Sequence, residues 1–301
     1  MVTKGSSGRW PKLVLALVLA AVAAFALSAC GSDDDSGSTA ASTTAAPAST
    51  SASTTGSADT GLNPAQAGKL TVGMNLQFKP EMYLENGQPA GYDVELLRLL
   101  APATGLDLNI QNLDFNGLIP GLQSRKFDMV SVGLSATPER RQVVDFSRAY
   151  VPYAQVLGVP AADAASVTSA DQLNRSGETI VALQGSTAEQ LARRMFPDAT
   201  INGLPDQNSA FLEVATGRAD GIVVEDYLLA QFQASNRGRL EKAQIDRPLD
   251  VQYGSYAVPK GNEAFVQFLD RFLCEKQQDG TLETLYKRAF SVTEMPPMPP
   301  C

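Results

Sequence analysis

The sequence predicts an α/β protein of two lobes, each with a parallel-type sheet flanked by helices, joined by a hinge of two strands. Two observations predict this fold. From about residue 69 to residue 290, short apolar runs typical of buried strands alternate with helix-like segments. Such alternation produces parallel sheets with helices on both faces. The stretch is also long enough to form two lobes.

The first part of this stretch is expected to form most of the first lobe. Short apolar runs predict buried strands at Leu70–Met74, Leu108–Asn112 and Asp128–Val132. Helical patterns cover Asp93–Leu100 and Gly117–Gln123. A third helix is expected to begin at Thr137-Pro138, because threonine is a good N-cap and proline suits the first helical turn.

A second set of alternating elements predicts the second lobe. The strands are expected at Thr179–Leu183, Ala199–Ile201 and Gly221–Val224. The helices are expected at Ala170–Leu173, Thr187–Met195, Gln207–Thr216 and Asp226–Ala234. Each strand is followed by a helix, so this lobe should also contain a parallel-type sheet.

Two crossings of the chain predict the hinge. An extended segment at Ala154–Val159 leaves the first lobe, and a strand at Tyr253–Val258 returns to it before two closing helices, Glu263–Lys276 and Thr281–Phe290. The predicted boundaries are residues 65–157 plus 254–301 for lobe 1 and residues 158–253 for lobe 2. A ligand would bind between the lobes, near the carboxyl ends of strands, and closure would be a hinge motion.

The first residues of the chain read as a lipoprotein signal peptide, residues 1–29. A basic start precedes the apolar run Leu13–Ala26, which is too short for a comfortable membrane span. Leu27-Ser28-Ala29-Cys30 then matches a bacterial lipobox. Lipidation of Cys30 would anchor the protein to the outer face of the cell membrane, as its only membrane attachment. The alternative is an ordinary secretory signal in which Cys30 is incidental.

Residues 30–64 are expected to hold the lipidated cysteine and a flexible tether. Their composition is almost wholly Ser, Thr, Ala, Gly, Asp and Pro, which cannot bury enough apolar surface to offset the entropy of ordering. A glycosylated stalk has the same composition and stays an alternative.

The balance of charges excludes some partners and some chemistry. The net charge is −8, and removal of Lys4, Arg9 and Lys12 with the signal leaves 21 basic against 32 acidic groups, or −11. An acidic surface argues against nucleic acid as a partner. The sequence contains no histidine, so the commonest general base and metal ligand is missing. We therefore expect no metal and no cofactor.

Two cysteines remain after Cys30. In an oxidising extracellular setting, Cys274 and Cys301 are expected to form a disulfide. This bond would hold the proline-rich tail against the helix near residues 271–276. Two unpaired thiols are the alternative.

One corner of the chain suits a carboxylate. The buried run Phe127–Gly133 ends in glycine, and Thr137-Pro138 starts a helix with Arg140 at its third position. Free N–H groups and a planar guanidinium would then lie side by side, and this combination binds two oxygens at once. The alternative is an Arg140 that is solvated or paired with a surface acid.

The segment LIPGLQSRKFDMVSVGLSATPERRQVVDFSRAY, residues 118–150, resembles the family 3 extracellular solute-binding proteins, the polar amino-acid receptors of ABC importers. It departs from the family pattern at Arg125, usually glycine, and at Ala149, often proline. The resemblance extends from about Lys69 to about Phe290. It implies the type II periplasmic-binding-protein fold, a monomer, an amino acid as ligand and an ABC permease as partner.

The resemblance also implies which residues hold the ligand. The α-carboxylate would bind Arg140, the hydroxyl and N–H of Ser135, and the backbone N–H groups of a second anion-binding loop at Ser186 and Thr187. The α-ammonium would contact the Gly133 carbonyl and Glu225, which stands where the family usually has aspartate. Asn75 replaces another usual aspartate and would either contact the ligand or cap its loop. Aromatic contacts are expected from Phe78 and Phe115, with core packing as the alternative for both.

Two other functions stay open on the sequence. An enzyme on the same scaffold, similar to dehydratases that lose water and CO₂, would use Glu225 or Glu81 as its acid or base, and that carboxyl would need a raised pKa in an apolar pocket. A sensory module would bind a ligand and signal to a partner in trans. Copurification of a permease would separate import from sensing.

Overall fold

The structure, a computed structural model, describes residues 60–301. The predicted signal peptide, Cys30 and most of the predicted tether therefore lie outside the described residues. Among the residues that are described, no helix has both the length and the apolar character needed to cross a membrane.

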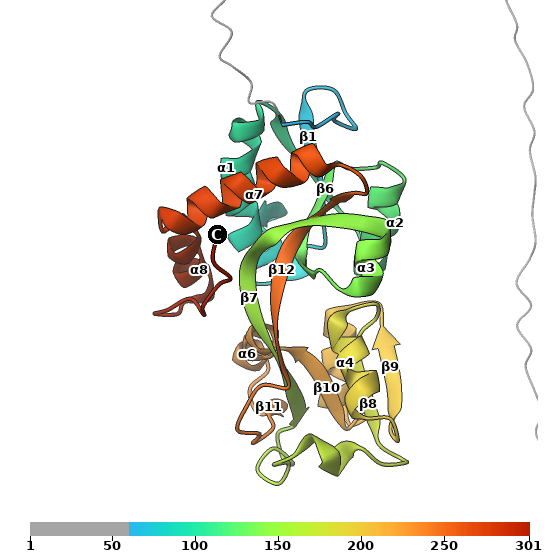
Figure 1. Ribbon diagram of the computed structural model, residues 1–301. Coiled ribbons are helices and arrows are strands. Elements are labelled where there is room, and N and C mark those ends of the chain that lie inside the picture. Colours follow the sequence, from blue (N-terminus) through green and yellow to red (C-terminus); the bar gives the residue numbers. More distant parts are fainter. Residues whose placement is uncertain (1–59) are drawn as a thin grey trace, which may run out of the picture. The chain divides into compact units, whose positions relative to one another are not determined.

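Strands of both lobes form one hydrogen-bonded ladder in the order β5-β1-β6-β12-β7-β10-β8-β9, with β11 paired to β7. The strands of this sheet are β1 Lys69–Met74, β5 Asp107–Asn112, β6 Met129–Ser135, β7 Val144–Pro160, β8 Thr179–Leu183, β9 Thr200–Leu204, β10 Gly221–Glu225, β11 Leu240–Lys242 and β12 Asp250–Pro259. In Figure 1, β7 and β12 run side by side from one group of elements to the other. These two strands are the predicted hinge.

Each lobe has a parallel centre, as predicted. In the first lobe, β1 is flanked by the parallel strands β5 and β6. In the second lobe, β8 is flanked by the parallel strands β9 and β10. The hinge strands are antiparallel to their neighbours: β12 pairs with β6 and β7, and β10 pairs with β7.

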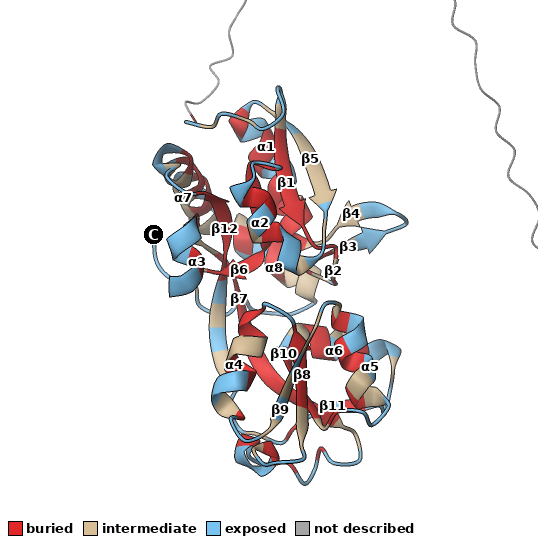
Figure 2. Cartoon of the chain, turned by 90° about the vertical axis from the view of Figure 1, so that its right-hand side faces the viewer, coloured by how far each residue is buried: buried red, intermediate tan, exposed pale blue. Residues whose placement is uncertain are grey.

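Helices cover these strands. They are α1 Tyr92–Thr104, α2 Leu118–Gln123, α3 Pro138–Val143, α4 Thr187–Met195, α5 Gln207–Ala215, α6 Asp226–Ser235, α7 Glu263–Gln278 and α8 Thr281–Phe290, with short 3-10 turns at Phe115–Gly117 and Ala170–Leu173. Figure 2 shows the buried residues along the strands and on the inner sides of the helices, while the outer sides are exposed. The apolar core therefore lies between the sheet and its covering helices.

The first hinge strand is longer than the sequence indicated. The prediction assigned only residues 154–159 to it, but β7 begins at Val144. Its partner explains the difference, because β12 pairs with β7 along the whole interval from Pro259↔Val144 to Asp250↔Gln155. Pairing with a strand a hundred residues away in the chain leaves no local signal in the sequence.

A small antiparallel sheet was not predicted. It consists of β2 Gln77–Phe78, β3 Met82–Glu85 and β4 Gln88–Ala90. The turn between β3 and β4 is Asn86-Gly87, and both residues have positive φ angles, 51° and 76°. An Asn-Gly pair between two short strands is a strong hairpin signal, so the sequence did contain the information. This sheet positions Glu81.

The packed part of the chain begins before Ala65, within the predicted tether. Leu62 packs against the main apolar core. The N–H of Ala65 donates to Asp128 Oδ1 at 2.6 Å. Residues 60–64 therefore belong with the first lobe, because the one leucine of this otherwise polar segment packs against its apolar core.

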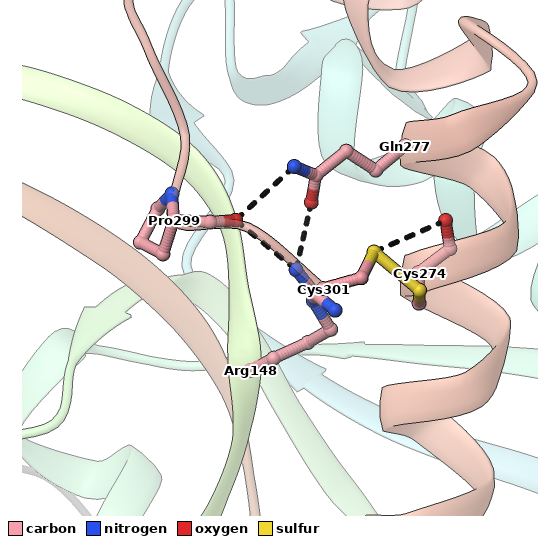
Figure 3. Close-up of a disulfide and its surroundings, with 5 residues drawn as sticks. All are labelled: Arg148, Cys274, Gln277, Pro299 and Cys301. Atoms are coloured by element: carbon pink, nitrogen blue, oxygen red, sulfur yellow. Dashed lines mark hydrogen bonds between the residues drawn. A yellow bond between two sulfur atoms is a disulfide. The ribbon is translucent and has the colours of Figure 1, made fainter.

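The C-terminal tail is held against α7 by a disulfide between Cys274 and Cys301, whose Cα atoms are 5.6 Å apart. Figure 3 shows the polar contacts beside it. Arg148 Nη2 donates to Gln277 Oε1 at 2.8 Å and to the Pro299 carbonyl at 3.1 Å, and Gln277 Nε2 donates to the same carbonyl at 3.1 Å. The tail is thus tied both to α7 and to the hinge strand β7.

Candidate ligand-binding site

The corner between β6 and α3 brings Arg140 into the interior. Thr137 caps α3, because its Oγ1 accepts from the Arg140 N–H at 3.3 Å. The Arg140 side chain is buried, and burial lowers its pKa without removing its charge at neutral pH. Its neighbour Arg141 instead lies over the ring of Phe146 and donates to the Ala136 carbonyl.

The guanidinium of Arg140 bonds only to neutral groups. Nη1 donates to the Ser135 carbonyl at 2.9 Å and Nη2 to the Gly185 carbonyl at 3.0 Å. The guanidinium carbon lies 5.9 Å from the centre of the Phe115 ring. None of the ion pairs among residues 60–301 includes Arg140. A buried cation of this kind is suited to an anionic group, because charges removed from water need a partner.

The corner between β8 and α4 faces the pocket from the second lobe. Ser186 is the N-cap of α4: its Oγ accepts from the Glu189 N–H at 3.1 Å and donates to the Leu183 carbonyl at 2.7 Å. Thr187 follows as the first helical residue, and its Oγ1 accepts from Gln155 Nε2 at 3.1 Å. The first N–H groups of a helix have no partner within the helix, so this corner also favours an anion.

Glu225 ends β10 and is the N-cap residue of α6. Its Oε1 accepts from Gln155 Nε2 at 3.4 Å. Burial raises the pKa of Glu225, while hydrogen bonds from its own backbone N–H and from Gln155 oppose that shift. A half-buried carboxyl with one long hydrogen bond is suited to accept from a cationic ligand group.

A second carboxyl of the pocket was not placed by sequence reasoning. Glu81 is 2 % exposed. Its Oε2 accepts a short hydrogen bond from the Tyr227 hydroxyl of the other lobe, and its Oε1 has no hydrogen-bond partner. Burial raises the pKa of Glu81 well above its ordinary value, and the nearby charge of Asp93 raises it further.

Gly133 is the residue that makes room for Glu81. Its φ angle is 55°, in the left-handed region. A Cβ atom at this position would lie 2.4 Å from Glu81 Oε1. The N–H of Gly133 donates to the Tyr150 hydroxyl at 2.9 Å. Glycine is therefore required here both by the backbone conformation and by the close approach of the carboxyl.

These groups line one pocket between the lobes, with a volume of about 410 Å³ including its open mouth. Eight of the predicted ligand-binding residues line it: Phe78, Phe115, Gly133, Ser135, Arg140, Ser186, Thr187 and Glu225. Glu81, which the sequence offered only as the acid or base of an enzyme, also lines the pocket. The lining residues that sequence reasoning did not name are Val132, Leu134, Tyr153, Leu183, Tyr227 and Leu228.

Asn75 does not line this pocket. It is buried behind it, where Nδ2 donates to the Leu113 carbonyl and Oδ1 accepts from Gln77 Nε2. These bonds hold the loop after β1 to the loop after β5. Asn75 therefore shapes the wall that carries Phe78 and Phe115, whose rings meet edge to face at 6.3 Å.

Ser135 is held by a network from the hinge. Its Oγ donates to Gln252 Oε1 at 2.7 Å and forms a short hydrogen bond with the Tyr153 hydroxyl. Tyr153 and Gln252 lie on β7 and β12. Because both hinge strands contact this serine, its orientation depends on the arrangement of the hinge.

The arrangement suits recognition of a small molecule with charges of both signs. Arg140 with the α4 corner would take an anionic group, and the carboxyls would take a cationic one. Among residues 60–301, no group of three or more His, Cys, Asp or Glu side chains could hold a metal ion.

Comparisons with known proteins agree with this geometry. The arginine-binding extracellular protein ArtP of Bacillus subtilis (strain 168) is 29% identical over 280 residues, which cover 92% of this chain and 97% of that protein. A cyclohexadienyl dehydratase of Pseudomonas aeruginosa is 27% identical over 218 residues, or 72% of this chain and 81% of the enzyme.

A solved structure extends the likeness to the fold. The amino acid ABC transporter substrate-binding protein AbpA from Streptococcus pneumoniae, bound to L-arginine, superposes with a TM-score of 0.69 at 26% identity, covering 74% of this chain and 95% of that one. The family described as bacterial extracellular solute-binding proteins, family 3, matches residues 70–292. The chain therefore belongs to this family of solute-binding proteins and has the two-lobed type II periplasmic-binding fold.

Proposed function

We propose that the protein is the lipid-anchored substrate-binding component of an ABC importer, and that it captures a polar amino acid or a close analogue between its lobes. The observation that carries this proposal is that Arg140 and Glu225 line the same pocket from opposite lobes. Arg140 is a buried cation with only neutral partners, and Glu225 is a half-buried carboxyl on the opposite lobe. An α-amino acid supplies one charge for each.

The relatives support the amino-acid part of the proposal. ArtP is named an arginine-binding protein, and AbpA, the substrate-binding protein of an amino acid ABC transporter, was crystallised with L-arginine bound. Delivery to a permease is extended to this chain by that likeness, and a monomeric state is part of the same proposal. The anchor rests on the lipobox ending at Cys30.

Titration of ligand-stripped protein with amino acids tests the binding role. We expect Arg140→Ala to weaken binding of the preferred amino acid by at least about 100-fold, because the variant leaves the ligand carboxylate buried without its cation. Arg141→Ala is the matched control, since this neighbour on α3 does not line the pocket, and it should bind normally. Equal affinities for the two variants would contradict the assignment of Arg140.

The anchor has its own test in intact cells. We expect the native protein in the membrane fraction and in the detergent phase after phase separation. Cys30→Ala should release it or leave it as an unprocessed precursor. A Cys30→Ala protein that is processed and stays membrane-bound would contradict lipidation at this residue.

A dehydratase-like enzyme is the second candidate function, favoured by the Pseudomonas relative and by the raised pKa values of Glu81 and Glu225. A carboxyl with a raised pKa is a suitable general acid. Incubation with a cyclohexadienyl acid decides between the two. Loss of water and CO₂ would produce an aromatic product with its own ultraviolet absorbance. The receptor proposal expects no such product.

A further inference from the structure

The carboxyl of Glu81 is not explained by binding of a zwitterion. Arg140 and Glu225 match the two charges that every α-amino acid carries. Glu81 is a second acid in the same pocket, and among the described residues it has no ion-pair partner. A buried carboxyl without a compensating charge is costly to maintain.

Glu81 lines the pocket, and one of its two carboxyl oxygens is buried without a hydrogen-bond partner. Oε2 accepts from the Tyr227 hydroxyl, and both residues line the cavity. Oε1 lies beside Gly133, another lining residue, and has no partner. A ligand that reaches this wall with hydrogen-bond donors would satisfy Oε1, and Tyr227 would hold the carboxyl in place from the opposite lobe.

The charges around the pocket decide the sign of that ligand group. The charged side chains that line it are Arg140, Glu81 and Glu225. Behind Glu81 lies the buried Asp93, whose charge acts on Glu81 in the same direction as burial. Neutral donors would satisfy the oxygen but leave the excess of acid in place. A positive group would both satisfy the oxygen and offset the excess of acid. A charge-assisted hydrogen bond is also about twice as strong as a neutral one.

We propose that Glu81, oriented by Tyr227, selects the side chain of the ligand, and that this side chain carries a cationic nitrogen, a guanidinium or an ammonium. The inference rests on the proposed function, since it assumes that Arg140 and Glu225 hold the α-groups. The ligand side chain is then recognised by Glu81, in the loop before β3. It is not recognised by Asn75, which lies behind the pocket wall and faces neutral partners. Burial of Glu81 raises its pKa, and a positive ligand group relieves that effect.

Citrulline is the matched neutral ligand for the test, because it has the shape of arginine with a carbonyl oxygen in place of one cationic nitrogen. Calorimetric titration of ligand-stripped protein should show L-arginine or L-lysine binding at least about 10-fold tighter than L-citrulline and L-glutamine, the lower end expected for a hydrogen bond to a charged group. Comparison of arginine with lysine separates a guanidinium from an ammonium.

Glu81→Gln then identifies the residue responsible. The variant keeps the size of the side chain and an acceptor for Tyr227, so we expect the ratio of arginine to citrulline affinity to fall about 10-fold or more, toward one. Glu85→Gln is the control, an exposed acid on β3 that does not line the pocket. It should leave the ratio unchanged.

Three outcomes would separate the two proposals. Wild-type protein that prefers citrulline or glutamine overturns the selection of a cation, and this comparison stands even if Glu81→Gln does not fold. A Glu81→Gln protein that keeps the wild-type ratio overturns the role of Glu81. Failure of every amino acid to bind would instead overturn the proposed function itself.

Discussion

At the scale of single residues, the pocket depends on acids that are kept away from water. Asp93, the second residue of α1, is fully buried, and its Oδ2 accepts from Ser131 Oγ and from the Tyr150 hydroxyl, each at 2.6 Å. Burial raises the pKa of Asp93 to about 7, although these hydrogen bonds oppose the shift. The folded protein therefore keeps a proton on Asp93 where the unfolded chain loses it.

This difference makes stability depend on pH. Between about pH 4 and pH 7 the folded state binds more protons than the unfolded state, so the free energy of unfolding should fall as the pH rises through this range. The raised pKa values of Glu81 and Glu225 act in the same direction. We expect Asp93→Asn to flatten the decline, measured by urea unfolding of the ligand-free protein at pH 5, 6, 7 and about 8.

Asp145→Asn is the contrasting variant for this series. Partial burial raises the pKa of Asp145, but the Lys260 ammonium and the Gly261 N–H lower it by more, so the net shift is downward. Its titration therefore lies below the measured range, and its removal should leave the slope unchanged. A slope as steep in Asp93→Asn as in the native protein would show that Asp93 is already ionised in the folded state.

The residues that sequence reasoning found and missed differ in a physical way. Arg140, Ser186 and Glu225 lie at or shortly after the carboxyl ends of buried strands, so the order of elements alone directs them toward the edge where ligands bind. Glu81 and Tyr227 meet only when the two lobes come together, 146 residues apart in the chain. A charged residue in a short irregular stretch gives no sign of such a partner.

At the scale of elements, the fixed position of the C-terminal tail is not explained by local structural propensity. The proline-rich stretch after α8 has no regular structure, yet Cys301, Arg148 and Gln277 hold it in place. Cys274 and Cys301 were predicted as a pair from their number and setting. The contact between the tail and β7 was not foreseen, because it depends on where α7 packs.

We expect loss of this disulfide to lower stability without changing ligand binding. The bond closes a loop with a sequence separation of 27 residues, for which the chain-entropy relation gives an upper figure of about 3–4 kcal/mol. For a chain of this size, Cys301→Ser should lower the melting temperature by several degrees, up to about 10 °C. Scanning calorimetry measures the shift.

The same variant provides its own control through the pocket. Neither cysteine lines the ligand-binding cavity, so amino-acid affinity should stay within about two-fold of the native value. The native protein under reducing conditions should have the same melting temperature as Cys301→Ser. A melting temperature that is the same in all three samples would show that the bond contributes nothing to stability.

At the scale of the whole described unit, hydrogen bonds join the lobes around the pocket. Asn116 Nδ2 donates to Gln184 Oε1 at 3.1 Å, and the Gln207 N–H donates to Gln77 Oε1 at 2.9 Å. Arg140 and Tyr227 add the two further bonds described above. These contacts exist only when the lobes are close, so they stabilise the closed state.

We expect Asn116→Ala to weaken the binding of every ligand by the same factor. Asn116 does not line the pocket, so its removal should act only on the population of the closed state. One hydrogen bond of ordinary strength corresponds to roughly a 2- to 10-fold rise in the dissociation constant. Calorimetry with arginine and citrulline measures it, and Asn109→Ala on β5 is a matched control. A change in the ratio of the two affinities would place Asn116 in direct contact with the ligand.

The general architecture was accessible from the sequence because it depends on local patterns. Alternating strands and helices, each recognisable by its own run of residues, defined two α/β lobes and the places where the chain crosses between them. The joining of both lobes into one ladder was not accessible, since it depends on the pairing of β12 with both β6 and β7.

The position of β12 has a consequence for the order of events during synthesis and export. In the sheet it stands between β6 and β7, but in the chain it comes after the entire second lobe. A chain that has emerged only as far as residue 249 contains every strand of the second lobe, while the first lobe still lacks the strand that connects its halves. We therefore expect the second lobe to mature first, because the first lobe can complete its sheet only after β12, Asp250–Pro259, has been made.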